Sequence, residues 1–280
     1  MTDESGTMRA YRLAYDGRPF HGFQRQPDVP TVEDATFDAL RDLDVLAAAA
    51  TKPGGYAAAG RTDAGVSARA QTVAFEAPEW LSPLAFNSEL PASVRAWASA
   101  DVDSGFHATH DARSREYVYF LYAPADTRAD RTLDDDRARE ALDRLSGEHD
   151  FHNLTPDETG TVRDLEASVE RDGAFLVVRL QAGGFARQLV RRVVGLVREV
   201  AGGEAGVAKV DRVLGSESVE GPEGVAPAAA QPLVLWDVAY DADFVVDKTA
   251  AESARAVWRR RHVERTVGAR VAGAVRDGIE

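Results

Sequence analysis

Alternating strand and helix patterns recur along the chain, and their order constrains the fold more than any other feature. In the first half, Met8 to Tyr15 alternates apolar and polar residues as a strand does. A helix pattern capped by Thr31 follows, and Ala70 to Ala77 is again typical of a strand. Ser82-Pro83 then opens a short helix before a strand pattern over residues 94–102. The first half therefore predicts the order β, α, β, α, β.

A similar order of elements is predicted for the second half. A strand over residues 113–122 precedes a helix over 133–145, which Gly147 ends. Asp172-Gly173 lies between two strand patterns and predicts a hairpin. An apolar helical stripe then runs up to Gly202-Gly203. A strand over 233–240 and a helix over about 250–266 complete an α+β chain of two loosely similar halves.

Composition narrows the class of protein. A hydrophobic fraction of 44% is that of a folded globular chain, and no segment approaches the roughly 20 apolar residues of a membrane span. The polar, acidic start MTDESGTMRA lacks the features of a targeting signal, so we expect the cytoplasm. The absence of cysteine excludes disulfides, thiolate zinc sites and a cysteine nucleophile.

The charged residues are unusual in kind. The net charge is -13, and only 3 of the 33 basic residues are lysines, which leaves 30 arginines against 46 acidic residues. Such a charge ordinarily disfavours nucleic-acid binding, which depends on cationic side chains. Acidic residues in place of surface lysines suit a cytosol of very high salt, where self-repulsion is screened. We therefore predict a halophilic, haloarchaeal host.

The segment from Gly60 to Gly65 places a carboxylate, Asp63, among small residues that a substrate can approach closely. Arg61, two residues away, can keep this carboxylate charged, as a nucleophile or base requires. The same spacing also fits a turn in which Asp63 bonds to its own backbone and Arg61 ties down a loop. Spacing alone favours the turn.

The longer run GRTDAGVSARA, beginning at Gly60, closely resembles the signature of the tRNA pseudouridine synthase A family. Further segments resemble other family motifs and occur in the family's order, so the resemblance covers about residues 8 to 240. These segments are Tyr15-Asp16-Gly17 with Phe20, Gly22 and Gln24, then Phe106-His107-Ala108, Arg115 to Tyr119, Gly184-Phe185 and Gln188 to Gly195.

The resemblance implies an α+β fold of two ferredoxin-like halves. These share a mainly antiparallel central sheet, with helices on one face and a central RNA-binding cleft. We expect an N-terminal half over residues 1–105, a C-terminal half over 106–245 and a helical extension over 246–280. A homodimer and a tRNA partner are also implied, with no membrane and no small-molecule cofactor.

The implied reaction isomerises uridine to pseudouridine in the tRNA anticodon stem-loop, at positions 38–40. By position in the motifs, Asp63 is the catalytic nucleophile or base, Tyr117 packs on the target uracil and Arg191 is the partner of Asp63. No metal or redox cofactor is needed for this chemistry. The residues expected to contact RNA are Arg61, Thr62, Gln24, Arg25, Arg69, Phe185 and Arg187, and we expect Arg12 and Arg18 to join the same cleft.

Two positions depart from the family pattern, which usually has His at Ser67 and Trp at Phe23. Neither is one of the three catalytic positions, so the departures concern RNA contacts rather than chemistry. Without the resemblance, Tyr117 is as well explained as a core residue. Arg191 likewise fits a solvated helix face, although clustered arginines in an acidic chain favour phosphate contact.

Two other functional classes stay open from the residues alone. One is a non-catalytic protein of the same fold that binds structured RNA. The other is a metal-dependent phosphoesterase that uses the pairs His107/His110 and His149/His152 with nearby carboxylates, although neither pair has a helical ligand motif. Arg259-Arg260-Arg261 also fits either an RNA contact or a solvated helix face.

Overall fold

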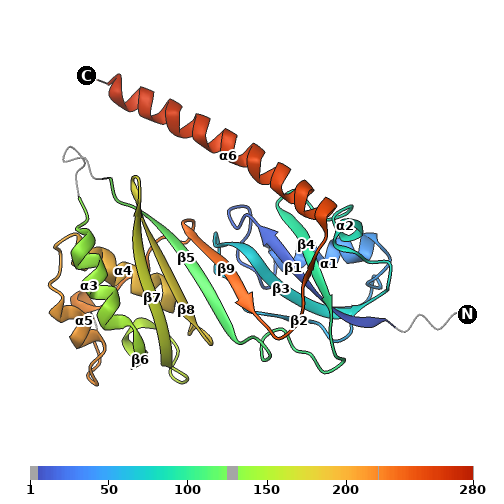
Figure 1. Cartoon of the computed structure of the whole chain (residues 1–280), viewed down its shortest axis with the longest axis horizontal. Coiled ribbons are helices and arrows are strands. Elements are labelled where there is room, and N and C mark those ends of the chain that lie inside the picture. Colours follow the sequence, from blue (N-terminus) through green and yellow to red (C-terminus); the bar gives the residue numbers. More distant parts are fainter. Residues whose placement is uncertain (1–5, 125–131, 220, 280) are drawn as a thin grey trace, which may run out of the picture.

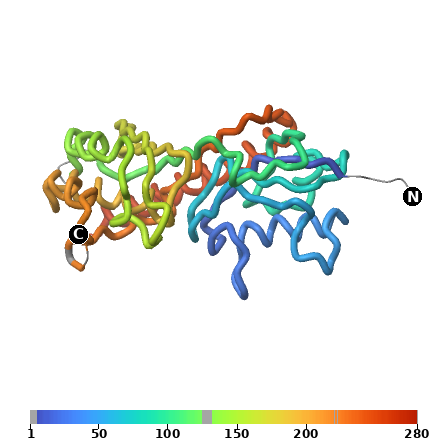
Figure 2. The backbone as a smooth tube through the Cα atoms, turned by 90° about the horizontal axis from the view of Figure 1, so that it is seen from below, coloured from blue at the N-terminus to red at the C-terminus, as the bar shows by residue number. Residues whose placement is uncertain are grey.

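The computed structural model describes residues 6–124, 132–219 and 221–279. The described strands form a ten-stranded sheet in the order β10-β4-β1-β3-β9-β5-β8-β7-β6, with β2 paired to β3 beside this path. Two groups of elements lie side by side along the long axis, one from each half of the sequence (Figures 1 and 2). The α+β prediction is confirmed, and the paired strands are antiparallel except β3 and β9.

The N-terminal group pairs β1 with β3 on one side and with β4 on the other. Both predicted helix caps are confirmed: Thr31 Oγ1 accepts from Asp34 N at 3.1 Å, and Ser82 Oγ accepts from Ala85 N at 3.1 Å. The elements are β1 (Thr7–Tyr15), α1 (Val32–Asp42), β2 (Ala57–Ala58), β3 (Ser67–Ala77), α2 (Pro83–Phe86) and β4 (Val94–Asp101).

The C-terminal group pairs β5, β8 and β7 in order, and their apolar residues form one buried cluster with those of α3 and α4. Asp134 caps α3 by accepting from two backbone amides. The elements are β5 (Ser114–Tyr122), α3 (Asp135–Leu145), β6 (Gly147–Asp150), β7 (Val162–Asp172), β8 (Phe175–Ala182), α4 (Leu189–Ala201) and α5 (Ala208–Val213), with 3-10 turns at His152–Leu154 and Gly221–Glu223.

Strand β9 (Leu233–Ala239) joins the two groups. It runs antiparallel to β5 and parallel to β3, but its ladder with β3 has only two residue pairs. Beyond that ladder, Arg69 Nε donates to Trp236 O at 2.8 Å and Arg12 donates to Val238 O at 2.9 Å. Both guanidiniums also pair with Asp237. Side chains thus extend the junction where backbone pairing stops, and the junction holds β3 and β5 on either side of β9.

The chain then returns to the N-terminal group through β10 (Val245–Val246) and α6 (Lys248–Asp277). Helix α6 begins beside α2 and β4 and extends diagonally past the sheet (Figure 1). It is longer than the helix expected over 250–266, because its exposed second half lacks the burial pattern from which a helix end is read. None of the helices in the described residues has both the length and the apolar character of a membrane span.

Two local expectations are corrected. The tight turn between β7 and β8 is centred on Gly173-Ala174, because Asp172 itself pairs with Phe175. Gly173 has a positive φ of 55°, as such a turn requires. Gly147 does not cap α3. Ser146 ends that helix, and Gly147, at φ 97°, begins β6 instead.

Candidate active site

The loop that carries Asp63 lies between β2 and β3 and is fixed from both sides. Tyr15 Oη and Thr62 Oγ1 form a buried hydrogen bond of 2.7 Å, and Phe23 N donates to Thr62 O at 3.0 Å. A bond of 3.1 Å from Val66 N to Asp63 O closes the turn. Backbone contacts therefore hold this loop and leave the carboxylate of Asp63 available for another partner.

A glycine brings a second segment close to the same loop. Gly22 has a φ of 99°, and a Cβ atom there would lie 2.9 Å from Thr62 O. A larger residue would be strained by its backbone and would also collide with the loop. The close approach explains a glycine at this position and brings Phe23 and Gln24 to the rim of the site.

Helix α4 supplies the partner of Asp63. Arg191, in the first turn, donates from Nη1 to Asp63 Oδ2 at 2.8 Å across 128 residues of sequence. Its Nε donates to Ala228 O at 2.7 Å, and Ala228 N donates back to Arg191 O at 2.8 Å. The arginine side chain is 18% exposed and that of Asp63 is 36% exposed. The guanidinium is thus held in place, whereas the carboxylate faces open space.

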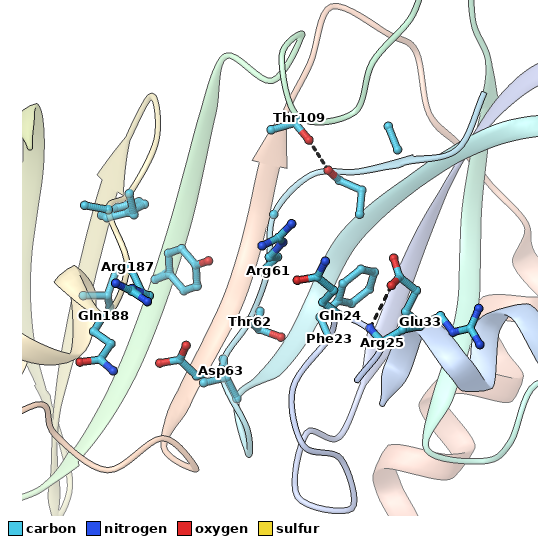
Figure 3. A pocket seen from close by; sticks show the side chains of 18 of the residues that line it. Phe23, Gln24, Arg25, Glu33, Arg61, Thr62, Asp63, Thr109, Arg187 and Gln188 are labelled. Carbon is cyan, nitrogen blue, oxygen red and sulfur yellow. Dashed lines mark hydrogen bonds between the residues drawn. The ribbon is translucent and has the colours of Figure 1, made fainter. Parts of the chain in front are cut away.

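Asp63 borders two cavities, of about 1110 Å³ and 530 Å³. Figure 3 shows Asp63 with Arg187 and Gln188 on one side and with Thr62, Phe23 and Gln24 on the other. Nine of the ten predicted site residues line the larger cavity. They are Gln24, Arg25, Arg61, Thr62, Asp63, Tyr117, Phe185, Arg187 and Arg191.

An aromatic pair forms part of the wall of the larger cavity. Tyr117 of β5 meets Phe185 edge-on, with ring centroids 5.2 Å apart and an interplanar angle of 89°. Burial raises the pKa of Tyr117 to about 12; Arg115 opposes this shift and the charge of Asp63 adds to it. The phenol is therefore protonated at neutral pH, and the ring offers a flat apolar surface near the carboxylate.

The predicted RNA-contact arginines differ in how they are held. Arg61 is exposed and makes no hydrogen bond or ion pair with any part of the chain that the structure describes. Arg187 pairs with Asp157 at 3.3 Å and is 62% exposed. Arg25 is bound to Asp34 at 2.7 Å and to Thr51 O at 3.0 Å. Arg61 is the least constrained of the three cations.

Three other predicted cleft arginines are not brought to the site. Arg69 does not line the cavities that border Asp63; it lies over the rings of Trp97 and Trp236 and binds Trp236 O. Arg12 pairs with Asp237 at 2.7 Å, and Arg18 also lies outside both cavity linings. The contacts of Arg69 and Arg12 place them at the β3–β9 junction.

The histidine pairs do not form a multidentate metal centre. The rings of His107 and His110 lie 4.2 Å apart, and His152 approaches Asp150 at 3.4 Å. Among residues 6–124, 132–219 and 221–279, no group of three or more His, Asp or Glu side chains is placed to hold a metal ion. The phosphoesterase alternative therefore has no supporting geometry in these residues.

Sequence reasoning missed two features that shape the site. Gln188 borders both cavities and adopts φ 61° immediately before α4, where it is the N-cap residue. Lys52, one of the three lysines, lines the larger cavity from the loop before β2. Gln188 belongs to a family-like motif, but a left-handed glutamine has no distinctive sequence signal.

Comparisons with known proteins agree with this geometry. A sequence profile described as tRNA pseudouridine synthase matches residues 141–241. The tRNA pseudouridine synthase A of Haloarcula marismortui is 59% identical over 97% of this chain and 100% of its own length. The chain belongs to the tRNA pseudouridine synthase A family. The tRNA pseudouridine synthase A of Halobacterium salinarum is 60% identical over 95% of this chain and 97% of its own length. The enzyme of that name from Methanosarcina acetivorans is 35% identical over 90% of this chain and 94% of its own length.

As a member of the tRNA pseudouridine synthase A family, the protein is an isomerase that makes pseudouridine. The haloarchaeal relatives agree with the acidic, lysine-poor composition. Among solved structures, a crystal structure of a Cbf5-Nop10-Gar1 complex aligns with a TM-score of 0.34 and 15% identity. The alignment covers 68% of this chain and 45% of that chain.

Proposed function

We propose that this protein isomerises uridine to pseudouridine in the anticodon stem-loop of tRNA, at positions 38–40, with Asp63 as the catalytic nucleophile or base. The observation that carries the proposal is the 2.8 Å pair of Asp63 and Arg191, which borders a cavity of about 1110 Å³. The carboxylate is partly exposed in a space large enough for a nucleotide, as attack on a sugar requires.

The reaction is an isomerisation whose atoms balance without a cofactor. The bond from C1′ to N1 of the uridine breaks, the base turns, and C1′ bonds to C5. The proton on C5 is lost, while N1 gains one. Asp63 starts this sequence either by attacking C1′ or by removing a proton from the sugar. Electrons are redistributed within the nucleotide, so no oxidant or reductant takes part.

The neighbouring residues have distinct proposed roles. Tyr117 packs on the turning uracil, with Phe185 supporting its ring at 5.2 Å. Arg191 orients the carboxylate of Asp63, because its guanidinium is also fixed by Ala228 O. A uridine must leave the base stack to reach this cavity. The proposed RNA contacts are Gln24, Arg25, Arg61, Thr62, Arg187 and, at the sheet junction, Arg69.

The second candidate is a non-catalytic protein of the same fold that binds structured RNA. It predicts the cavity and the arginines equally well, but it does not require an Asp63–Arg191 pair beside an aromatic ring. The pair therefore favours the enzyme. Because the proposed substrate is tRNA, we also place the protein in the cytoplasm.

The test is pseudouridine mapping on an unmodified tRNA transcript incubated with purified protein at high salt. We expect pseudouridine in the anticodon stem-loop and at least a roughly 10⁴-fold lower rate for Asp63→Asn. Asp38→Asn removes an equal charge from a side chain that is 70% exposed on α1, and serves as the control with an unchanged rate. Binding of tRNA without any new pseudouridine would leave the second candidate.

We further propose a homodimer in which α6 packs against a second copy of the chain. Five large apolar residues of the C-terminal segment, spaced four apart, are 56–75% exposed: Val263, Val267, Val271, Val275 and Ile279. Residues 248–280 contain eight basic and four acidic residues, a net charge of +4, which leaves -17 for the rest of the chain. The helix therefore complements the acidic remainder of a second copy in charge, and its exposed apolar residues offer surface that a dimer would bury.

The dimer is tested by light scattering at high KCl. We expect a mass of twice 30.2 kDa for the wild type. Val267→Asp with Val271→Asp should give the monomer mass, because the new charges would be buried at the interface. A monomeric wild type, or a dimer that survives both substitutions, would contradict this interface.

A further inference from the structure

Helix α6, which is largely exposed, also binds a buried carboxylate of the N-terminal group. Arg261 and Arg265, one turn apart, both donate to Asp16 Oδ2, 245 and 249 residues earlier in the sequence. The side chain of Asp16 is only 4% exposed, whereas the two arginines are 20% and 40% exposed. Two guanidiniums from a distant helix thus compensate an almost completely buried carboxylate.

Asp16 is the centre of a tripeptide that touches the catalytic loop on both sides of Asp63. Before it, Tyr15 Oη is bonded to Thr62 Oγ1 at 2.7 Å. After it, Gly17 N donates to Ser67 Oγ at 3.1 Å. A Cβ atom on Gly17 would lie 2.1 Å from Val66 O, so only glycine permits this approach. Any displacement of residues 15–17 must therefore move the loop or break its supports.

The remaining contacts of Asp16 tie the same tripeptide to the sheet. Asp16 N donates to Ser93 O at 3.0 Å, just before β4, and Asp16 Oδ1 accepts from Arg18 N at 3.3 Å. Without the two α6 arginines, the buried carboxylate would have no cation to balance it and would be driven toward water. That movement would pull Gly17 away from Val66.

We propose that Asp16, Arg261 and Arg265 are positioning residues through which α6 holds the catalytic loop in its reactive geometry. None of the three touches the cavities that border Asp63. Their effect is on the placement of Asp63, and a misplacement of about 1 Å at a reacting group can lower a rate by roughly 100-fold. The proposal rests on the catalytic role of Asp63.

The test compares the wild type with a double variant that carries both Arg261→Ala and Arg265→Ala. In single-turnover assays at high KCl, we expect pseudouridine formation to slow by roughly 10- to 100-fold. The affinity for tRNA, measured separately, should change less than about twofold, because RNA contacts are not removed. Circular dichroism must show the variant folded at the assay temperature.

A matched control removes two other arginines from the same helix. Arg255 and Arg259 are 67% and 70% exposed, and both pair with Glu252. Combined Arg255→Ala and Arg259→Ala removes the same charge from α6 and should leave the rate unchanged. An equal loss of rate in this control would assign the effect to the charge of the helix. That result would contradict the proposed positioning role of Asp16, Arg261 and Arg265.

Two further variants separate positioning from general destabilisation. Arg261→Lys with Arg265→Lys keeps both cations and should recover most of the rate. Adding Asp16→Asn to the double alanine variant should cause no further loss, because the three residues act as one unit. An unchanged rate in the double alanine variant, or a rate loss matched by weaker tRNA binding, would contradict the proposal. The rate of Asp63→Asn against that of the wild type, measured in the same assay, tests the role of Asp63 independently.

Discussion

Two carboxylates of the N-terminal half are each bound by arginine from a distant helix, yet their surroundings differ. Asp63 is 36% exposed, borders two cavities and receives one hydrogen bond from Arg191 of α4. Asp16 is 4% exposed, borders neither cavity and receives two guanidiniums from α6. The two groups illustrate different uses of an ion pair.

The difference in exposure explains the difference in role. A carboxylate that attacks or deprotonates a substrate needs an open side, and Asp63, proposed for that role, pairs with one cation among the described residues and has free space beside it. A carboxylate that fixes a chain segment needs no open side, and burial makes its ion pair less sensitive to screening by salt. In a protein adapted to concentrated salt, a buried pair is therefore the more dependable structural link.

The largest expected effect is on the rate of pseudouridine formation when the cation of the Asp63–Arg191 pair is removed. Arg191→Ala should lower the single-turnover rate by roughly 100- to 1000-fold, since it removes the hydrogen-bond donor that orients Asp63. Affinity for tRNA should change far less. Arg212→Ala, at a side chain 62% exposed on α5, is the control with the same charge change. A parallel fall in tRNA affinity would instead make Arg191 a phosphate contact.

A smaller effect is expected on the free energy of unfolding, which should distinguish the Asp63–Arg191 pair from the contacts of Asp16 with α6. The double variant Arg261→Ala, Arg265→Ala leaves a buried carboxylate uncompensated and should lower the free energy of unfolding by roughly 3 kcal/mol. Arg191→Ala leaves Asp63 able to reach water and should cost less than about 1 kcal/mol. Chemical denaturation at high KCl measures both. Equal losses would remove the distinction drawn from exposure.

The smallest expected effect is on the free energy of unfolding at alkaline pH. It follows from Tyr117, whose pKa is raised from 10.0 to about 12 mainly by burial. The folded state holds this proton more tightly than the unfolded state, so the associated stability is present below pH 10 and is lost as the pH rises toward 12. Tyr117→Phe should therefore lose less stability than the wild type over that range in denaturation experiments. Identical losses of stability in the wild type and in Tyr117→Phe would contradict the raised pKa of Tyr117.

The same titration distinguishes the two carboxylates. The negative charge of Asp63 is one of the causes that raise the pKa of Tyr117, whereas Asp16 is not among them. Asp63→Asn should therefore lower the pKa of Tyr117, and Asp16→Asn should leave it in place. Ultraviolet absorbance of the phenolate, with Tyr117→Phe to identify the signal, measures the shift.

The local elements were largely predictable because they depend on residues close in sequence. Thr31 and Ser82 each cap the helix expected of them, and the alternation before Tyr15 forms β1. The short elements β6 and α5 were missed, because segments of four and six residues carry too little periodicity to stand out. Helix α6 was predicted too short, since nothing buries its second half.

The candidate site was predictable as a set of residues but not as an arrangement. Nine predicted residues line one cavity, and seven of them lie in the ordered motifs, because motif order preserves identity along the chain. Arg69 looked equivalent to Arg61 in sequence, yet the two are separated in space. Arg69 follows the start of β3 and is drawn to Trp236 O at 2.8 Å, whereas Arg61 belongs to the loop beside the cavity.

The sequence by itself determined the family and the salt-adapted composition, and it selected Asp63, Tyr117 and Arg191 as candidates, since these depend on residue types and their order. Tertiary structure decided which charges meet. The Asp63–Arg191 bond spans 128 residues, and the contacts of Asp16 with α6 span 245 and 249. Partners at such separations are chosen by the packing of strands and helices around them, and a charge carries no local signal of the partner it will find.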